Sequence, residues 1–257
     1  MIFDTHAHYL DSRFDEDREE LLSSFNSNGI KYVTEVCAAA DDIDSVYNFT
    51  KKYDFIYGAL GVHPSETDKL TENDMNRIKE LAMDEKIVAV GEIGLDYHFE
   101  DDPSPEVQKK WFIRQMEVAK EVKLPIIVHS RDAAKDTLDI MKDMNAHEIG
   151  GVIHCYSYSP EMAREFLNMG FYIGIGGVVT FKNAKKLKEV VEMMPADRIL
   201  LETDCPYMAP TPHRGERNSS LFIPLIIEEI ANIKGLSYDE VADITMKNAL
   251  TMYGIKE

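Results

Sequence analysis

Short apolar runs rich in β-branched residues alternate along the chain with longer segments of mixed polarity. In the longer segments apolar residues recur every three or four positions, which is the spacing of one helix face. The runs lie at residues 2–5, 31–36, 55–60, 87–91, 125–128, 150–154, 171–175 and 198–202, and clear helical segments lie at 15–27, 71–83, 105–122, 133–145 and 183–194. The pattern predicts a strand followed by a helix, repeated about eight times.

Continuous apolar runs are expected where strands are buried on both faces, as in a parallel sheet. About eight strand–helix units in 257 residues fit a (β/α)8 TIM barrel better than an open doubly wound sheet. Glycine and proline stand at element ends, and no linker or low-complexity tract interrupts the pattern. We therefore predict one TIM-barrel domain over residues 1–257, with helices in 236–257 packed over the barrel.

Composition narrows the class of protein. Aspartate and glutamate total 46 against 28 lysine and arginine residues, a formal net charge of −18, so the chain as a whole repels polyanions. This excludes a general nucleic-acid coat protein, but bound cations or local arginines can reverse the sign of the field at a reaction site. No apolar run approaches the ~18 residues of a membrane span, and the first residues do not resemble a signal peptide. These features predict a cytoplasmic protein without membrane contact.

Titratable residues stand where the predicted strands end, and this is the face at which TIM barrels carry their functional groups. His6 and His8 leave the first strand with the i, i+2 spacing that points two side chains to one side. Strands two and seven are predicted to contribute no such group. Four histidines and two carboxylates suit two divalent ions of borderline or hard character. The candidate ligands are His6, His8, Glu92, His129, His154 and Asp204.

Each candidate ligand also has a purely structural interpretation. A histidine at a strand end can be a hydrogen-bonded core residue, and a carboxylate after a strand can cap the next helix. Burying the whole set at one end of a barrel would cost more than such roles return, unless the groups were paired or bound to metal. The set therefore favours a metal site, whereas His98 and His147, in polar surroundings, are predicted to be surface residues.

Several segments, in the same order, resemble motifs of the TatD family of metal-dependent hydrolases. They read DTHAHY, GVHP, VAVGEIGLDY, LPIIVHSR, GVIHCYS, YIGIGGVVTFKNA and LLETDCPYMAP. The resemblance implies a TIM barrel of the metallo-dependent hydrolase group with deoxyribonuclease or phosphodiesterase activity. Matched position by position, it implies the same set of ligands, with Glu92 as the bridging carboxylate. Two divalent ions, of Mg, Mn or Zn, are the expected cofactors.

Two positions depart from the family pattern. Members commonly read RNEP after the ETDxPY motif, whereas here Arg217-Asn218 is followed by two serines, so no residue takes the place of that glutamate and proline. The first motif often has cysteine between its histidines, and here the residue is Ala7. Because neighbouring side chains in a strand point to opposite sides, Ala7 is predicted to face away from the centre.

Catalytic and substrate-binding roles are predicted around this centre. A water between the ions, oriented by Asp204, is expected to attack the phosphorus, so Asp204 and Glu92 are the catalytic candidates. His63 either binds phosphate, assists the leaving group or only shapes the turn before Pro64. Arg131 either offers a fork to phosphate or lies solvated at the start of the next helix.

Four further residues lie close to the candidate ligands in sequence. Asp96 and Tyr97 are predicted to hydrogen-bond a ligand histidine. Cys155 and Cys205 each follow a candidate ligand, and strand alternation predicts that both point away and pack. With no CxxC pair in the chain, the cysteines are interpreted as small buried hydrophobic residues.

The resulting hypothesis is a deoxyribonuclease that acts as a 3'-5' exonuclease, as a monomer or weak oligomer. Net negative charge disfavours a long duplex, so single-stranded or frayed DNA ends are the expected substrate. The alternative is an amidohydrolase-like enzyme that cleaves a C–N or ester bond of a small molecule, because the same centre would activate water for a carbonyl carbon. A third interpretation is a binding or scaffold protein stabilised by metal.

Overall fold

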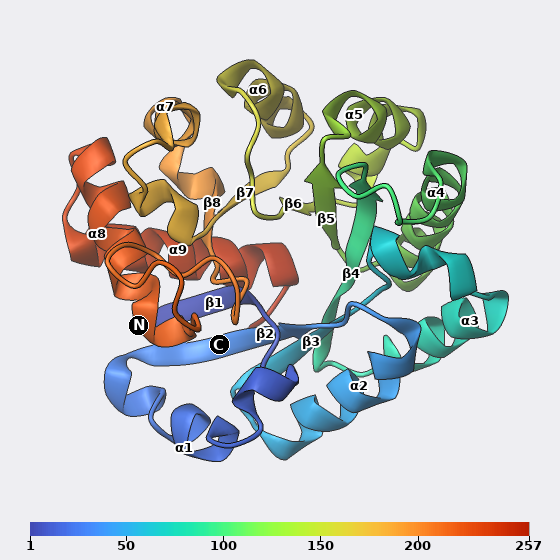
Figure 1. Cartoon of the computed structure of the whole chain (residues 1–257), viewed down its shortest axis with the longest axis horizontal. Helices are drawn as coiled ribbons and strands as arrows, with labels where there is room; N and C mark the ends of the chain where they lie inside the picture. Colours follow the sequence, from blue (N-terminus) through green and yellow to red (C-terminus); the bar gives the residue numbers. More distant parts are fainter. Residues whose placement is uncertain (257) are drawn as a thin grey trace.

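The computed structural model describes residues 1–256 and contains eight parallel strands hydrogen-bonded in the order of the sequence (Figure 1). Each strand is bonded to the next one along the chain, as the repeated strand–helix pattern predicts. The strands are β1 (Ile2–Ala7), β2 (Ile30–Val36), β3 (Ile56–Leu60), β4 (Ile87–Asp96), β5 (Ile126–Arg131), β6 (Gly151–Ile153), β7 (Tyr172–Ile175) and β8 (Ile199–Leu201).

Contacts between the first and last strands close the sheet into a barrel. Ala7 and Cys205 form a parallel bridge, and two backbone hydrogen bonds of 2.9 Å join Asp204 N–H to His6 and His8 N–H to Cys205. The Thr5 hydroxyl adds a bond to the Leu201 carbonyl. The predicted TIM barrel is therefore confirmed.

Helices surround the barrel and follow the strands in turn (Figure 1). None of the helices within residues 1–256 is both long enough and apolar enough to cross a membrane. The helices are α1 (Arg18–Ser23), α2 (Ile43–Lys52), α3 (Glu72–Leu81), α4 (Pro105–Val122), α5 (Ala134–Asp143), α6 (Pro160–Asn168), α7 (Lys185–Met193), α8 (Ile223–Lys234) and α9 (Tyr238–Tyr253).

The last helix covers the amino-terminal end of the barrel. Met246, Ala249, Met252 and Tyr253 of α9 belong to one buried cluster with side chains of the barrel strands. The ring of Phe3 from β1 lies 5.6 Å from the ring of Tyr253, centroid to centroid. The helices predicted after residue 236 therefore pack over the barrel, although α8 begins earlier, at residue 223.

The helix predicted over residues 15–27 is much shorter in the structure, because α1 covers only Arg18–Ser23. The serine hydroxyls of this segment bond to backbone carbonyls three residues earlier, as for Ser23 to Glu20 and Ser27 to Ser24. Such bonds compete with the regular helical pattern. Gly29 then turns the chain into β2 with a φ of 81°.

Strand β4 continues to Asp96, well beyond its predicted end at residue 91, and two glycines explain how. A Cβ atom at Gly91 would stand 2.6 Å from the Ile127 side chain, and one at Gly94 would stand 1.9 Å from the His129 carbonyl oxygen. Glycine therefore lets β4 lie against β5 along its full length. Because of this extension, both Glu92 and Asp96 lie on β4 and neither caps a helix.

Candidate metal centre

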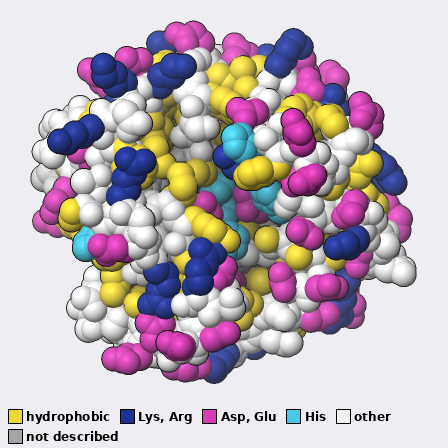
Figure 2. All heavy atoms as spheres, in the orientation of Figure 1, with side chains coloured by type: hydrophobic (Ala, Val, Ile, Leu, Met, Phe, Trp, Pro, Cys, Tyr) yellow, Lys and Arg dark blue, Asp and Glu magenta, His cyan; other side chains and the backbone are white. Residues whose placement is uncertain are grey.

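The candidate ligands converge at the carboxyl-terminal mouth of the barrel. The first strand and its end carry His6 and His8, while Glu92 lies on β4 and His129 on β5. His154 directly follows β6, and Asp204 stands three residues after the end of β8. A cavity of about 530 Å³ opens over them, lined among others by His8, His63, Glu92, His129, His154 and Asp204. Figure 2 shows histidines at the floor of the hollow in the middle of this face.

One set of donor atoms lies around His6. The Nε2 atom of His6 is 3.1 Å from the Nε2 atom of His8 and 3.4 Å from a carboxylate oxygen of Glu92. The Nε2 atom of His8 is 3.5 Å from an oxygen of Asp204. Two ligands of one tetrahedral Zn²⁺, each at about 2.05 Å, stand about 3.4 Å apart. The spacing of this set therefore fits a single ion.

A second set of donor atoms lies around His129 and His154. The other oxygen of Glu92 is 2.8 Å from Nδ1 of His129 and 3.5 Å from Nε2 of His154. The same nitrogen of His154 is 3.9 Å from Asp204. Glu92 thus presents one oxygen to each set, and Asp204 also reaches both. This is the arrangement expected for two neighbouring ions that share carboxylates.

The far ring nitrogens of three histidines face hydrogen-bond acceptors, and this fixes the proton position of each neutral ring. Nδ1 of His8 is 2.9 Å from the Val36 carbonyl, and Nε2 of His129 is 2.9 Å from Asp96. Nδ1 of His154 is 3.2 Å from Glu202. Each neutral ring therefore carries its proton on that outer nitrogen and turns a lone pair toward the centre.

Lone pairs consequently face carboxylate oxygens inside the centre. His129 Nδ1 and Glu92 Oε1, only 2.8 Å apart, are both acceptors when the ring is neutral. Either an extra proton or a cation must lie between such atoms. The donor set therefore fits divalent metal ions, which would satisfy every inward-facing lone pair at once.

When no metal is bound, protons on the histidine rings lie between these facing nitrogen and oxygen atoms. Burial lowers the pKa of His129, but its hydrogen bonds to Asp96 and Glu92 outweigh burial and raise the pKa to about 9. Burial is likewise outweighed at His154, where Glu202 and Glu92 raise the pKa to about 10, and at His8, where Asp204 raises it to about 9. Burial raises the pKa of Glu92, yet His154 and His6 bring it well below its ordinary value.

Metal binding should therefore weaken as pH falls, since a protonated ring cannot donate a lone pair. His8, His129 and His154 must lose their protons when metal binds, because their pKa values of about 9, 9 and 10 leave them charged at neutral pH. We expect the dissociation constant for Mn²⁺ to rise at least about tenfold per unit of pH decrease. Calorimetric titration between about pH 6 and 9, in buffers of different ionisation enthalpy, measures the constant and the released protons. A dissociation constant independent of pH would contradict the proton displacement.

Asp96 makes the hydrogen bond to His129 that the sequence predicts, but Tyr97 does not. The Tyr97 hydroxyl donates to Asp136 at 3.0 Å, because Tyr97 directly follows β4 and its side chain points to the other side from that of Asp96. His98 also bonds outside the centre, to Asp132 at the surface, as its polar flanks predict.

Three buried carboxylates near the mouth were not among the sequence candidates. Glu35 corrects the prediction that strand two carries no such group, since it accepts backbone bonds of 2.7 and 2.9 Å from Tyr9 and Leu10. Asp4 accepts from the Thr203 hydroxyl and the Ser220 hydroxyl. These two join the segments that carry the candidate ligands. Their signal in the sequence is a carboxylate inside an apolar run.

Glu202, the third, explains the glycine of strand seven. A Cβ atom at Gly174 would stand 2.2 Å from a Glu202 oxygen, so only glycine leaves room for this side chain. Glu202 also accepts a hydrogen bond of 2.6 Å from Cys155 N–H. Strand seven therefore contributes space for the residue that orients His154.

The Cys155 side chain lines the cavity, so the prediction that it points away is wrong. Strand β6 ends at Ile153, and Cys155 has a φ of 44°, so the alternation of strand side chains no longer applies. Its sulfur joins His154 and Asp204 in a group of potential donors. Cys205 is fully buried, as predicted.

The cavity is lined by both His63 and Arg131, the two predicted phosphate-binding residues. Nδ1 of His63 accepts from Ser65 N–H at 3.2 Å and so caps the short 3-10 helix Pro64–Lys69. Its ring centroid is 4.3 Å from that of His129. Arg131 ends β5 rather than starting a helix, and its guanidinium makes no ion pair within residues 1–256.

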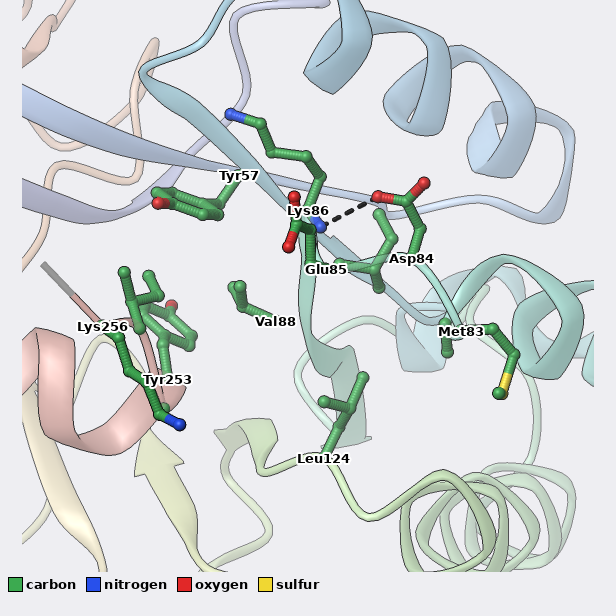
Figure 3. Close-up of a pocket in the computed structure, with 13 residues that line it drawn as sticks. Tyr57, Met83, Asp84, Glu85, Lys86, Val88, Leu124, Tyr253 and Lys256 are labelled. Atoms are coloured by element: carbon green, nitrogen blue, oxygen red, sulfur yellow. Dashed lines mark hydrogen bonds between the residues drawn. The ribbon is translucent and has the colours of Figure 1, made fainter.

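A second cavity, of about 550 Å³, lies at the opposite end of the barrel (Figure 3). Tyr57, Lys86 and Tyr253 lie around it, and Lys86 N–H donates to Asp84 at 3.0 Å. No histidine or cysteine is among the residues that line it. The groups that can hold metal are therefore at the mouth, where TIM barrels carry their chemistry.

Comparison with known proteins agrees with this geometry. The family model described as TatD related DNase matches residues 3–254. The chain belongs to the TatD family. It is 44% identical over 255 residues to YabD of Bacillus subtilis, an uncharacterized metal-dependent hydrolase, and the match covers 99% of this chain and 100% of that protein. This chain is accordingly a metal-dependent hydrolase of the TatD family.

Two other TatD relatives bear on fold and chemistry. The crystal structure of YJJV, a TatD homolog from Escherichia coli K12, superposes with a TM-score of 0.92 at 30% identity and covers 99% of this chain and 98% of that one. The 3'-5' ssDNA/RNA exonuclease TatD of Cronobacter sakazakii is 30% identical over 240 residues, covering 91% of this chain and 90% of that protein. The same barrel is thus present in a solved TatD structure.

Proposed function

We propose that this hydrolase is a 3'-5' exonuclease that removes nucleotides from single-stranded DNA or frayed DNA ends with two divalent ions. The observation that carries the proposal is that Glu92 and Asp204 each reach both donor sets at the floor of one open cavity. His6, His8, His129 and His154 complete the proposed ligands. The name and activity of the relative from Cronobacter sakazakii support the choice of substrate.

Bound divalent ions supply an acidified water and neutralise charge on a phosphoryl oxygen. Asp204 is the proposed base for that water. Asp204 is the more exposed of the two central carboxylates, with 20% of its side chain accessible to solvent against 5% for Glu92. Burial raises the pKa of Asp204, but His8 and His154 bring the pKa below its ordinary value, so the carboxylate is ionised and able to accept a proton. Glu92 holds the two donor sets together.

His63 and Arg131 are proposed to bind the phosphate. Burial and the neighbouring His129 lower the pKa of His63 to about 4, so its ring is neutral at pH 7. Because Nδ1 accepts from Ser65, the proton of the neutral ring is on Nε2, which can donate to a phosphate oxygen. A neutral imidazole is a poor acid, which favours phosphate binding over protonation of the leaving group. Arg131 offers its unpaired guanidinium fork to the same group.

Two labelled single-stranded oligonucleotides test the proposal. With Mn²⁺ present, a 5'-labelled strand should shorten one nucleotide at a time, and a 3'-labelled strand should release labelled mononucleotide at once. A phosphorothioate at the 3'-terminal linkage should slow both reactions, and a chelator should stop them. A panel of amides and lactones assayed beside the DNA serves as the comparison. Cleavage of that panel without cleavage of DNA would contradict the proposal and support the amidohydrolase-like alternative.

A further inference from the structure

Exposed apolar side chains gather at the rim of the metal-lined cavity. Six large hydrophobic residues are exposed within residues 1–256, and three of them, Phe99, Tyr207 and Met208, line this one cavity. The exposed fractions are 57% for Phe99 and 50% for Tyr207. Leaving such rings in water costs free energy, and their concentration around one pocket marks a binding surface.

The two rings reach the cavity from opposite sides. Phe99 follows β4, whereas Tyr207 and Met208 follow β8. The strands run in order around the barrel and β8 closes onto β1, so β4 and β8 lie half-way round from one another. The candidate metal centre, on the floor of the cavity, therefore lies between Phe99 and Tyr207.

An arginine lies over each ring. The Arg131 guanidinium carbon is 5.1 Å from the centroid of Phe99, and that of Arg13 is 4.1 Å from the centroid of Tyr207. Arg13 is itself held by Asp11 through bonds of 2.9 and 2.8 Å. These cation–π contacts hold the rings. The charge of Arg13 is balanced by Asp11, whereas Arg131, with no ion pair among residues 1–256, adds positive charge to the rim of an acidic protein. In each of the two rings, one face is thus in contact with an arginine.

We infer that Phe99 and Tyr207 are two stacking platforms for the nucleobases on either side of the scissile phosphate. This inference rests on the proposed nuclease function. Aromatic rings beside cations and a phosphate-binding site are the elements by which proteins bind single strands without reading sequence. In a duplex the two bases that flank a phosphate are stacked on one another, whereas in a single strand they can separate, so the platforms favour single-stranded nucleic acid over duplex. Arg131, which contacts Phe99 and lines the same cavity, serves both ring and phosphate.

Alanine variants tested on normal and abasic DNA measure the stacking. Phe99→Ala and Tyr207→Ala should each raise KM for a single-stranded decamer about tenfold, with kcat within about twofold of wild type. Tetrahydrofuran residues in place of the last two nucleosides should raise KM for the wild type similarly, but add little in the variants. Phe99→Trp and Tyr207→Phe should restore KM. Tyr238→Ala, which removes an exposed aromatic side chain away from the cavity, is the matched control.

A fluorescence measurement reads base contact without catalysis. The one natural tryptophan, Trp111, is 6% exposed, so the signal of Tyr207→Trp reports on the rim. A phosphorothioate-linked oligothymidylate should quench this signal in the metal-loaded protein, whereas a strand of abasic phosphorothioates should not.

The outcomes separate this inference from the proposed function. If the wild type does not cleave single-stranded DNA, the proposed function fails. If the wild type cleaves DNA but the alanine variants keep their KM, or lose activity equally on normal and abasic strands, the platforms are overturned and the function stands. A KM increase confined to apolar esters would also overturn the platforms, because it would assign the rings to small apolar substrates.

Discussion

Replacing Asp204 with asparagine should lower kcat on single-stranded DNA by about 10²- to 10⁴-fold, the range that a positioned general base contributes. The carboxylate faces the cavity between His8 and His154 and is ionised at neutral pH, whereas an amide cannot accept the proton of water. Asparagine keeps one oxygen in nearly the same place, so metal is expected to remain bound. Steady-state rates and the metal content of the same preparation measure the two effects together.

Asp132→Asn is the matched control for this variant. Asp132 and Asp204 both have positive φ, 53° and 56°, a conformation that asparagine also tolerates, so the backbone is affected equally. Asp132 bonds to His98 at the surface and is not among the residues that line the cavity. Its substitution should leave kcat unchanged. Wild-type activity of the Asp204 variant with full metal content would show that another group is the base.

Glu92→Gln should remove metal from the protein and lower the rate by about 10³-fold or more. The change keeps the shape of the side chain but removes the negative charge shared by both donor sets. An amide also turns an NH₂ group toward one set, where a donor cannot bind a cation. Metal analysis after gel filtration should find fewer than two ions per chain, and hydrolysis of the labelled strand should fall in parallel.

Glu66→Gln controls for the loss of one negative charge near the mouth. Glu66 is partly buried on the 3-10 helix Pro64–Lys69 and belongs to neither donor set. This variant should keep its metal and its rate. Two ions per chain in Glu92→Gln would instead mean that Glu92 does not bridge them.

The strand ends were the most predictable part of the site. Apolar runs such as 125–128 mark the buried part of a strand, and the barrel brings the polar side chains that follow each run to one mouth, even though β5 itself continues to Arg131. This reasoning is enough to gather His6, Glu92, His129 and Asp204 in one place. It needs no side-chain detail, since the carboxyl ends of parallel strands meet.

Local backbone conformation was much less predictable. Gly91 and Gly94 let β4 continue along β5, which only the neighbouring side chains of β5 reveal. Cys155 faces the cavity because β6 is short and the chain leaves it with positive φ. Phe99 gave no signal, because it follows a strand in a segment of acidic residues where exposed and buried rings look alike.

The packing of α9 against the barrel closes the proposed reaction chamber at its base. Phe3, Ile127, Leu200 and Tyr253 belong to the buried cluster that fills the amino-terminal end, so the mouth is the way in and the way out. If the substrate is single-stranded DNA, as proposed, the strand reaches the metal centre through the mouth and cannot thread through the barrel. The released mononucleotide leaves by the route that the next substrate needs, so product and substrate compete for the same opening.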